Sequence, residues 1–207
     1  MTLRALVLVL VALLLTGCGS DRTTSGGKSR KMLCEVEPET SGQPPEISPL
    51  AADSKHRLVF TTNKGAFTVE LDAKTAPCAG GSMLQLAKKG FFNGTIFHRI
   101  VPGFVIQGGD PTGTGTGGPG YKTSDTPPEN ARYTKGVVAM AKTMDEAPGT
   151  AGSQFFVVTG ADVGLPPDYA ILGKVVDGLD VVEKIGKLGG PDERPTQRVE
   201  IESVRTE

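Results

Sequence analysis

The sequence of 207 residues lacks tryptophan and is poor in side chains that bind transition metals. It contains two histidines and three cysteines, and no two cysteines form a C-x-x-C pair. A structural zinc site usually needs four nitrogen or sulfur ligands, often in such close pairs. The composition therefore argues against a zinc site.

An excess of charge of one sign is also missing. The chain has 22 lysines and arginines against 23 aspartates and glutamates, which gives a formal net charge of −1. Such a balance produces no field that would attract nucleic acid, so we expect no nucleic-acid partner. Hydrophobic residues make up 38% of the chain, which is enough for a core, and 28 glycines and 15 prolines indicate many turns.

The glycines of residues 113–120 lack the neighbours that a phosphate-binding loop needs. No GKS or GKT element follows them, and no order of strand, glycine loop and helix surrounds them. Phosphate binding is therefore disfavoured, and turn geometry explains these glycines better.

Only one long apolar run is present, the 11 residues Ala5–Leu15, and about 20 are needed to cross a bilayer. This run follows Arg4 and leads into LTGC, Leu15–Cys18, which resembles the lipobox of bacterial lipoproteins. We expect a signal peptide over residues 1–17 and a lipidated Cys18. The two lipid chains would anchor an exported protein to the bacterial cell membrane, with its domain facing outside the cytoplasm. The alternative is an ordinary secretory signal with an incidental cysteine.

Export changes the interpretation of the other two cysteines. If Cys18 is lipidated, Cys34 and Cys78 remain as an even pair in an oxidising compartment. We expect a disulfide between them, which would fasten the start of the mature chain to the folded domain. Two free buried thiols are the alternative.

A change in composition divides the mature chain. Residues 18–54 are rich in Ser, Thr, Pro and Gly with little hydrophobic periodicity, so they read as the lipidated end and a tether, at least as far as Lys31. Residues 55–207 form the predicted domain. Four basic residues of the tether could touch anionic lipid headgroups, although a solvated spacer is favoured: Arg22, Lys28, Arg30 and Lys31.

The predicted domain is composed mainly of short strands. RLVFTT and AFTVELD flank Asn63-Lys64-Gly65, which predicts a hairpin. Six further runs are typical of strands: TIFHRI, FVIQGG, GVVAMA, SQFFVVT, AILGKVV and RVEIESV. About eight strands without βαβ alternation predict an all-β fold, a closed barrel with no exposed sheet edges.

Two helices complete the expected elements. The first covers Thr75–Lys89, with Thr75 as its cap, Pro77 in its first turn and Gly90 after its end. Gly80-Gly81 is unusual there, because each glycine costs about 1 kcal/mol relative to alanine in a helix interior. The second helix covers residues 178–188, in which apolar side chains share one face.

Two motifs are more specific than the pattern of elements. FHRIVPGFVIQGGDPTGTGTGGPGY (97–121) and GSQFFVVT (152–159) resemble the cyclophilin family of peptidyl-prolyl cis-trans isomerases, and the likeness extends from about Arg57 to the C-terminus. The resemblance implies a closed eight-stranded antiparallel barrel capped by two α-helices, with a proline-binding groove on its outer surface. It also implies rotamase activity in protein folding that needs no metal and no other cofactor.

The first motif contains a charge within an apolar run. Arg99 matches the catalytic arginine of the family, and Gln107 matches the side chain that helps to hold it. A buried guanidinium without a partner is costly, so a carboxylate or a ligand must face it. An ion pair with Asp110 or Glu129 is the structural alternative to a catalytic role.

The resemblance also implies a set of substrate-binding residues. Phe104, Val105 and Phe156 would form the proline pocket, although ordinary core packing is the alternative for the phenylalanines. For His98 a packing role is an equal alternative. The full set comprises His98, Phe104, Val105, Ala141, Lys142, Gln154, Phe156, Leu165 and Tyr169.

The sequence departs from the family at two places. Many members carry a tryptophan that helps to bind cyclosporin, and Gly164 lies roughly at its position here, so weak cyclosporin binding is expected. Lys142 replaces a common asparagine, and the connection 142–150 is longer than usual.

The sequence therefore predicts an exported, lipid-anchored isomerase that acts on X–Pro bonds. Its partners would be proline-containing peptides and unfolded exported proteins, and a monomer is expected. A proline-peptide binding module or chaperone without relevant turnover is the second hypothesis, and a purely structural envelope lipoprotein is the third.

Overall fold

The structure is a computed structural model that describes residues 32–207. The expected signal peptide, Cys18 and the first part of the tether lie outside the described residues. Within 32–207, no helix has the length and apolar character needed to cross a membrane.

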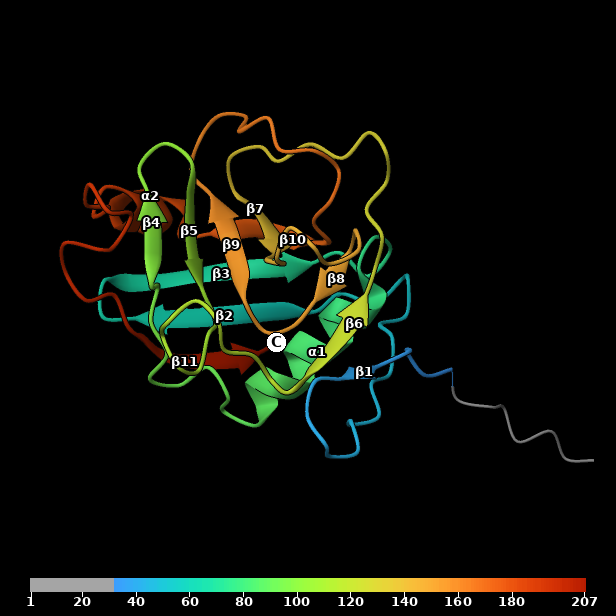
Figure 1. The fold of residues 1–207 in the computed structure, drawn as a ribbon. Coiled ribbons are helices and arrows are strands. Elements are labelled where there is room, and N and C mark those ends of the chain that lie inside the picture. The colour runs from blue at the N-terminus through green and yellow to red at the C-terminus, as the bar shows by residue number, and fades with distance from the viewer. Residues whose placement is uncertain (1–31) are drawn as a thin grey trace, which may run out of the picture. The chain divides into compact units, whose positions relative to one another are not determined.

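Eight strands form one antiparallel sheet that curls on itself (Figure 1). In spatial order they are β11 (Ile201–Thr206), β2 (Arg57–Thr62), β3 (Gly65–Leu71), β10 (Ile171–Asp177), β7 (Val137–Met140), β9 (Phe155–Val158), β5 (Val105–Gly108) and β4 (Arg99–Val101). These are the eight strands that the sequence predicts, and the hairpin at 63–65 joins β2 to β3. The expected eight-stranded antiparallel fold is confirmed.

The two edges of this sheet meet over a short distance. A single bridge joins Ile96, just before β4, to Glu200, just before β11. The Phe97 N–H donates to the Val199 carbonyl at 3.0 Å, and the Ile201 N–H donates to the Thr95 carbonyl at 2.8 Å. The barrel is therefore closed by a few hydrogen bonds and not by a long ladder.

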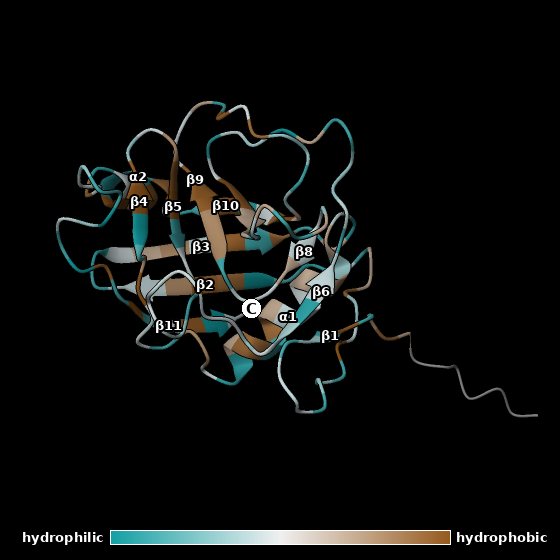
Figure 2. Ribbon diagram, viewed as in Figure 1, coloured by the Kyte–Doolittle hydropathy of each residue, from teal (hydrophilic) through white to brown (hydrophobic). Residues whose placement is uncertain are grey.

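The inside of the curled sheet is filled by apolar side chains, and much of β2, β3 and β9 is hydrophobic in Figure 2. Phe60 and Phe67 stack with ring centroids 4.9 Å apart, and Phe155 packs against Phe60 at 5.2 Å. All three are buried. Such interlocked aromatic side chains dominate the stability of a small core.

Both expected helices are present. α1 (Pro77–Lys88) packs against β11 and α2 (Leu179–Gly186) packs against β3. Met83 of α1 and Val182 of α2 are fully buried in the barrel core.

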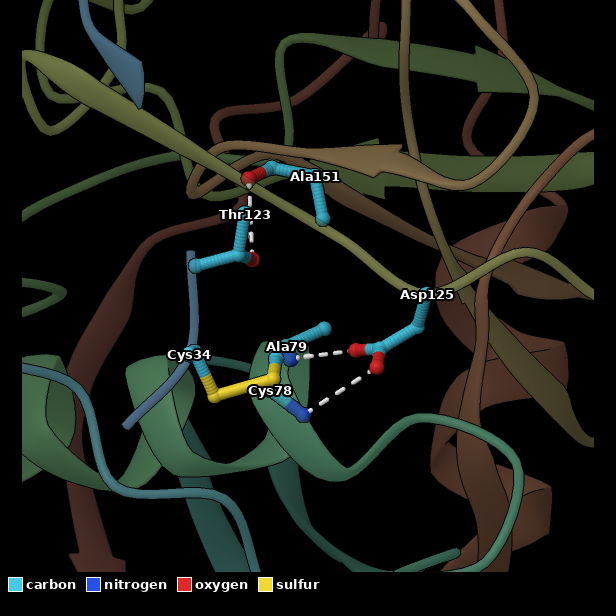
Figure 3. Close-up of a disulfide and its surroundings, with 6 residues drawn as sticks. All are labelled: Cys34, Cys78, Ala79, Thr123, Asp125 and Ala151. Carbon is cyan, nitrogen blue, oxygen red and sulfur yellow. Dashed lines mark hydrogen bonds between the residues drawn. A yellow bond between two sulfur atoms is a disulfide. The ribbon is translucent and has the colours of Figure 1, made fainter. Parts of the chain in front are cut away.

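The start of α1 differs from the prediction. Its N-cap residue is Ala76 and not Thr75, and the cap residue makes no side-chain hydrogen bond to the helix. Instead the Asp125 carboxylate, from the loop after β6, accepts the N–H groups of Cys78 (3.2 Å) and Ala79 (2.6 Å), as Figure 3 shows. A distant carboxylate therefore does what a local cap would do, because free first-turn N–H groups need an acceptor.

Three short strands form a second sheet that the sequence does not predict. In spatial order they are β1 (Glu37–Pro38), β6 (Tyr121–Ser124) and β8 (Thr150–Ala151), all antiparallel. The sheet lies beside α1 in Figure 1. It connects the N-terminal segment to the loops of the barrel.

The N-terminal segment is fastened to the domain by the expected disulfide, Cys34–Cys78, which is confirmed (Figure 3). The Cys34 N–H also donates to the Ile47 carbonyl at 2.9 Å, and Ile47 is fully buried. The composition of residues 18–54 predicts a tether over this part of the chain. In the structure, residues 46–50 instead cross α1: the Leu50 N–H donates to the Pro77 carbonyl at 3.0 Å, and Gln85 Nε2 donates to the Glu46 carbonyl at 3.2 Å.

This crossing explains the two glycines inside α1. A Cβ atom on Gly81 would collide with the carbonyl oxygen of Ser48, and one on Gly80 would lie 2.6 Å from Leu50 Cδ1. The loss of helix propensity at these positions is therefore offset by close packing of the N-terminal segment on the helix.

Candidate active site

The register of the sheet places one row of side chains in the core. Ile100 of β4 lies opposite Ile106 of β5, which lies opposite Val157 of β9, which lies opposite Val138 of β7. All four are fully buried in the barrel core.

The adjacent row has the opposite orientation, because successive side chains of a strand point to opposite faces. It runs Arg99, Gln107, Phe156 and Ala139 across the same four strands. Phe156 and Ala139 belong to a second apolar cluster, separate from the barrel core. The two residues expected to be catalytic therefore lie side by side on the outer face of the sheet.

A pocket of about 290 Å³ opens on this outer row. The Phe156 and Tyr169 rings meet edge to face with centroids 5.4 Å apart, and the Tyr133 hydroxyl holds Tyr169 by donating to its carbonyl at 2.7 Å. Nine residues line the pocket, all of them expected from the sequence: Arg99, Phe104, Val105, Gln107, Ala141, Lys142, Phe156, Leu165 and Tyr169.

Arg99 supplies a positive charge at the edge of this pocket. Its Nη1 donates to Gln107 Oε1 at 3.4 Å, its Nε donates to Glu193 Oε2 at 2.6 Å, and its guanidinium carbon lies 6.0 Å from the centre of the Phe104 ring. The carboxylate partner is thus Glu193, and not Asp110 or Glu129 as the alternative interpretation held. About a third of the Arg99 side chain is exposed (35%), so it remains accessible to a ligand.

Gln107 is held in turn by a line of amide groups. Its Nε2 donates to Gln154 Oε1 at 3.1 Å, and Gln154 Nε2 donates to the carbonyls of Gly115 and Gly117, both at 2.9 Å. Each amide therefore uses its nitrogen as donor on one side and its oxygen as acceptor on the other. This order directs the Gln107 oxygen toward Arg99.

The loop that carries these two carbonyls is shaped by a buried carboxylate. Asp110 is fully buried and accepts hydrogen bonds from the Thr112 N–H (2.7 Å), the Thr112 hydroxyl (2.8 Å) and the Gly115 N–H (2.5 Å). Burial alone would raise the pKa of Asp110, but the hydrogen bonds from Thr112, Gly117 and Gly115 lower it to about 2.

His98 is the one substrate-binding candidate that lies apart from the others. It does not line the pocket, and its Nδ1 is buried without a hydrogen-bond partner among the described residues. Burial is the main cause that lowers the pKa of His98, and the nearby Asp110 carboxylate acts against it. Its position under the loop near Gly115 is that of a packing residue.

Lys142 lines the pocket, but its charge is already occupied. The ammonium is almost completely buried, lies 2.6 Å from Asp168 Oδ2, and donates to the carbonyls of Thr143 (3.1 Å) and Glu146 (3.0 Å). Three donors thus meet three acceptors. The Lys142 ammonium therefore stabilises the connection 142–150, and only the aliphatic part of the side chain and the backbone remain to line the pocket.

A second hollow of about 210 Å³ adjoins the pocket and shares Gln107, Ala141 and Lys142 with it. Gln154 stands in its wall, at the margin of the proline pocket as the resemblance implied. Glu39 of the N-terminal segment lines it too, held by Lys122 at 3.3 Å. Among residues 32–207 no group of three or more His, Cys, Asp or Glu side chains is arranged to bind a metal ion.

Sequence reasoning missed three residues that support the site: Tyr133, Asp168 and Glu193. Each reaches the site from a loop, and each contact forms only when strands far apart in the sequence are brought together. Glu193, for example, is 94 positions from Arg99. No motif or spacing in the sequence marks these three residues.

Comparisons with known proteins agree with this geometry. The family model described as cyclophilin type peptidyl-prolyl cis-trans isomerase/CLD matches residues 57–206. Peptidyl-prolyl cis-trans isomerase-like 1 of Aspergillus oryzae is 40% identical over 154 residues, which cover 72% of this chain and 93% of the relative. Peptidyl-prolyl cis-trans isomerase CYP18-2 of Arabidopsis thaliana is 34% identical over 165 residues, which cover 77% and 92%. Both relatives are eukaryotic.

Solved structures similar to this chain are also cyclophilin type isomerases. The crystal structure of a cyclophilin type peptidyl-prolyl cis-trans isomerase of Cryptosporidium parvum has a TM-score of 0.68 to this chain at 30% identity, and covers 74% of this chain and 98% of its own. A second structure of that protein, solved in the presence of the dipeptide Ala-Pro, has a TM-score of 0.65 at 31% identity, covering 72% and 96%. Sequence, fold and the outer-face pocket thus lead to one conclusion: the chain belongs to the cyclophilin-type peptidyl-prolyl cis-trans isomerase family.

Proposed function

We propose that Arg99 is the group that accelerates X–Pro rotation in this isomerase. Rotation breaks amide conjugation and is opposed by a barrier of about 18–20 kcal/mol. As the bond twists, the proline nitrogen becomes pyramidal and regains a lone pair that can accept a hydrogen bond. A guanidinium N–H facing the pocket would bind this twisted state more strongly than either planar state, and such differential binding is what lowers a barrier.

The apolar side of the pocket would hold the proline ring. Phe104, Phe156 and Tyr169 supply aromatic walls, and Leu165 and Val105 complete them. A ring fixed in this way turns about the X–Pro bond only by moving the residue before it. The observation that carries the proposal is the position of the Arg99 guanidinium beside these walls, within hydrogen-bond distance of Gln107.

The residue before proline would lie along Ala141 and Lys142. The Ala141 N–H already donates to the Gln154 carbonyl at 2.9 Å, so recognition there would use the carbonyl side of the backbone. An acceleration of 10⁵ corresponds to about 7 kcal/mol of selective stabilisation, which electrostatics and pocket shape would have to supply together.

The proposed site of action is the outside of a bacterial cell membrane. The support is the apolar run Ala5–Leu15 followed by LTGC, which predicts a lipoprotein signal and a lipidated Cys18. Uncatalysed isomerisation takes tens to hundreds of seconds, so it can limit the folding of exported proteins. Unfolded exported chains are therefore the proposed clients.

The proposal is tested with a chain that begins at Lys31, because residues 31–207 form one compact unit. The cis-to-trans conversion of an Ala-Pro-Phe reporter peptide is followed through a coupled protease. We expect fast conversion by the wild type and a loss of at least about 100-fold in kcat/KM for Arg99→Ala. Arg57→Ala is the matched control, since Arg57 pairs with Glu70 on another part of the barrel.

The outcomes separate the proposal from the second hypothesis. Equal rates for wild type and Arg99→Ala would contradict the role of Arg99. A folded wild type with no rate above background would instead favour a module that binds proline peptides without turnover.

A further inference from the structure

Glu193 has an unusual backbone conformation. It is the only residue other than glycine with a positive φ (63°) among residues 32–207. Side chains of L-residues rarely adopt this region, and such residues persist where the surrounding structure imposes them, often at functional sites.

Hydrogen bonds within the loop after α2 impose this conformation. The Gly190 N–H donates to the Arg194 carbonyl at 2.7 Å, and the Glu193 N–H donates to the Gly190 carbonyl at 3.1 Å. At the base of the loop Gly189 pairs with Pro195 in an isolated bridge. The loop is thus a closed turn with Glu193 at its bend.

The loop is docked directly on the strand that carries Arg99. The Ile100 N–H, on the edge of the sheet, donates to the Glu193 carbonyl at 2.7 Å. A Cβ atom on Gly189 would collide with the Ile100 carbonyl, so the two backbones are in close contact. Because Arg99 precedes Ile100, this docking brings the Glu193 side chain beside the guanidinium.

The guanidinium is then held at two of its nitrogens. Glu193 Oε2 lies 2.6 Å from Nε, and Gln107 Oε1 lies 3.4 Å from Nη1. A planar group held at two points cannot turn freely, and its remaining N–H groups keep one direction. Without Glu193, the long Arg99 side chain would keep only the long hydrogen bond to Gln107 and its place near the Phe104 ring.

We propose that Glu193 is a positioning residue for this isomerase, which sets the orientation of Arg99 toward the twisted peptide bond. The inference rests on the proposed role of Arg99. Because Glu193 acts through Arg99 and does not line the pocket, its removal lowers kcat and leaves KM nearly unchanged.

The test uses the full chain with three substitutions. Glu193→Gly removes the carboxylate and relieves the positive φ, so its melting temperature is expected to equal or exceed that of the wild type. Its kcat is expected to fall about tenfold, with KM within about twofold. Glu193→Gln keeps an acceptor without the charge and should fall about threefold. Asp192→Asn is the matched control, because Asp192 is an exposed carboxylate of the same loop that does not contact Arg99.

A second readout does not depend on activity. In ¹⁵N-resolved NMR spectra, the Arg99 Nε–Hε resonance should lie downfield and exchange slowly with water in the wild type and in Asp192→Asn. In Glu193→Gly it should move upfield and exchange fast. Arg99→Ala is measured beside these variants.

Wild-type kcat and an unmoved Nε–Hε resonance in Glu193→Gly, together with an inactive Arg99→Ala, would overturn the positioning role alone. Full activity of Arg99→Ala would show that Arg99 is not needed for catalysis. The positioning role of Glu193 would then be overturned together with the proposed role of Arg99.

Discussion

Arg99 forms an exposed ion pair with Glu193 and also lines the pocket. The side chains of Arg99 and Glu193 are 35% and 51% exposed, and ion pairs this open contribute only about 0–1 kcal/mol to stability. The pair is therefore better explained by the orientation that it gives the guanidinium than by its effect on folding. The same reasoning does not apply to Lys142, whose ammonium is almost completely buried and must keep its partners.

Asp110 gives a prediction about acid stability. Its pKa is about 2 in the folded chain against an ordinary value of 3.8, so the folded state favours the charged form. This contribution is complete above about pH 4 and is lost as the pH falls through about 2. We expect Asp110→Asn to lower the free energy of unfolding by roughly 2 kcal/mol at pH 7 and by almost nothing at pH 2.

Denaturant unfolding of the wild type and Asp110→Asn at pH 7, 4 and 2 measures this difference. Asp177→Asn serves as the control, because Asp177 is exposed and its carboxylate takes part in no hydrogen bond among the described residues. A loss that is the same at all three pH values would show that the carboxylate charge is not the cause.

The absence of tryptophan gives a prediction about cyclosporin. The resemblance to cyclophilins implies that Gly164 lies roughly at the position of that tryptophan, and a Cβ atom on Gly164 would meet no atom within 4 Å. An open surface in place of a large aromatic ring removes contact area from the drug. We expect half-inhibition only at a concentration at least about tenfold above that for a tryptophan-containing cyclophilin, which is a loss of about 1.4 kcal/mol. Titration of the drug against isomerase activity decides the matter, and equal potency would refute the expectation.

The sequence predicts the pocket well and its supports poorly, for a physical reason. Five of the nine pocket residues lie in the two motifs. Four of these lie on β4, β5 and β9, where alternation and register fix their directions: Arg99, Val105, Gln107 and Phe156. Glu193 and Asp168 act through side chains that reach the site from loops, and loop paths depend on packing between distant segments. Local propensity contains no information about such contacts.

At the scale of elements, the length of a strand and the periodicity of its apolar residues decide whether the sequence predicts it. All eight strands of the barrel show alternating or continuous apolar runs, and all eight were predicted. The strands of the small sheet, β1, β6 and β8, have between two and four residues, and β1 contains a proline. Their pairing follows from the disulfide and from the burial of Ile47 on α1, which no short window of sequence reveals.

The disulfide gives a prediction at this scale. Cys34 and Cys78 are 44 positions apart, and closing such a loop restricts the unfolded chain. We expect the Cys34→Ser, Cys78→Ser double variant to lose about 2–4 kcal/mol of unfolding free energy. Residues 34–50 should also become sensitive to protease, since the covalent attachment of the segment is gone and only the β1–β6 pairing and the burial of Ile47 remain. Isomerase activity should remain, because no residue of the segment lines the 290 Å³ pocket.

Limited proteolysis and denaturant unfolding of the double variant provide the measurement, with the wild type in reductant as a parallel. If the double variant resists both protease and denaturant as well as the wild type does, the β1–β6 pairing and the burial of Ile47 suffice without the disulfide.

At the scale of the whole molecule, the proposed lipid anchor can be tested directly. In a bacterial host that processes lipoproteins, the full chain is expected in the membrane fraction and Cys18→Ser in the soluble or unprocessed fraction. The cysteine double variant at 34 and 78 is the matched control and should stay with the membrane. Incorporation of labelled fatty acid into Cys18→Ser equal to that into the wild type would refute lipidation at that residue.

The paired rows across β4, β5, β9 and β7 have a consequence for how this protein can change over time. Neighbouring positions on one backbone serve the core and the reaction surface alternately, so deleting a single residue within these strands would exchange the two sets. Insertions are harmless only in the connections, such as the long stretch 142–150. Preferences for new substrates can therefore arise when loops lengthen around unchanged strands, whereas the proposed role of Arg99 can change only by single substitutions.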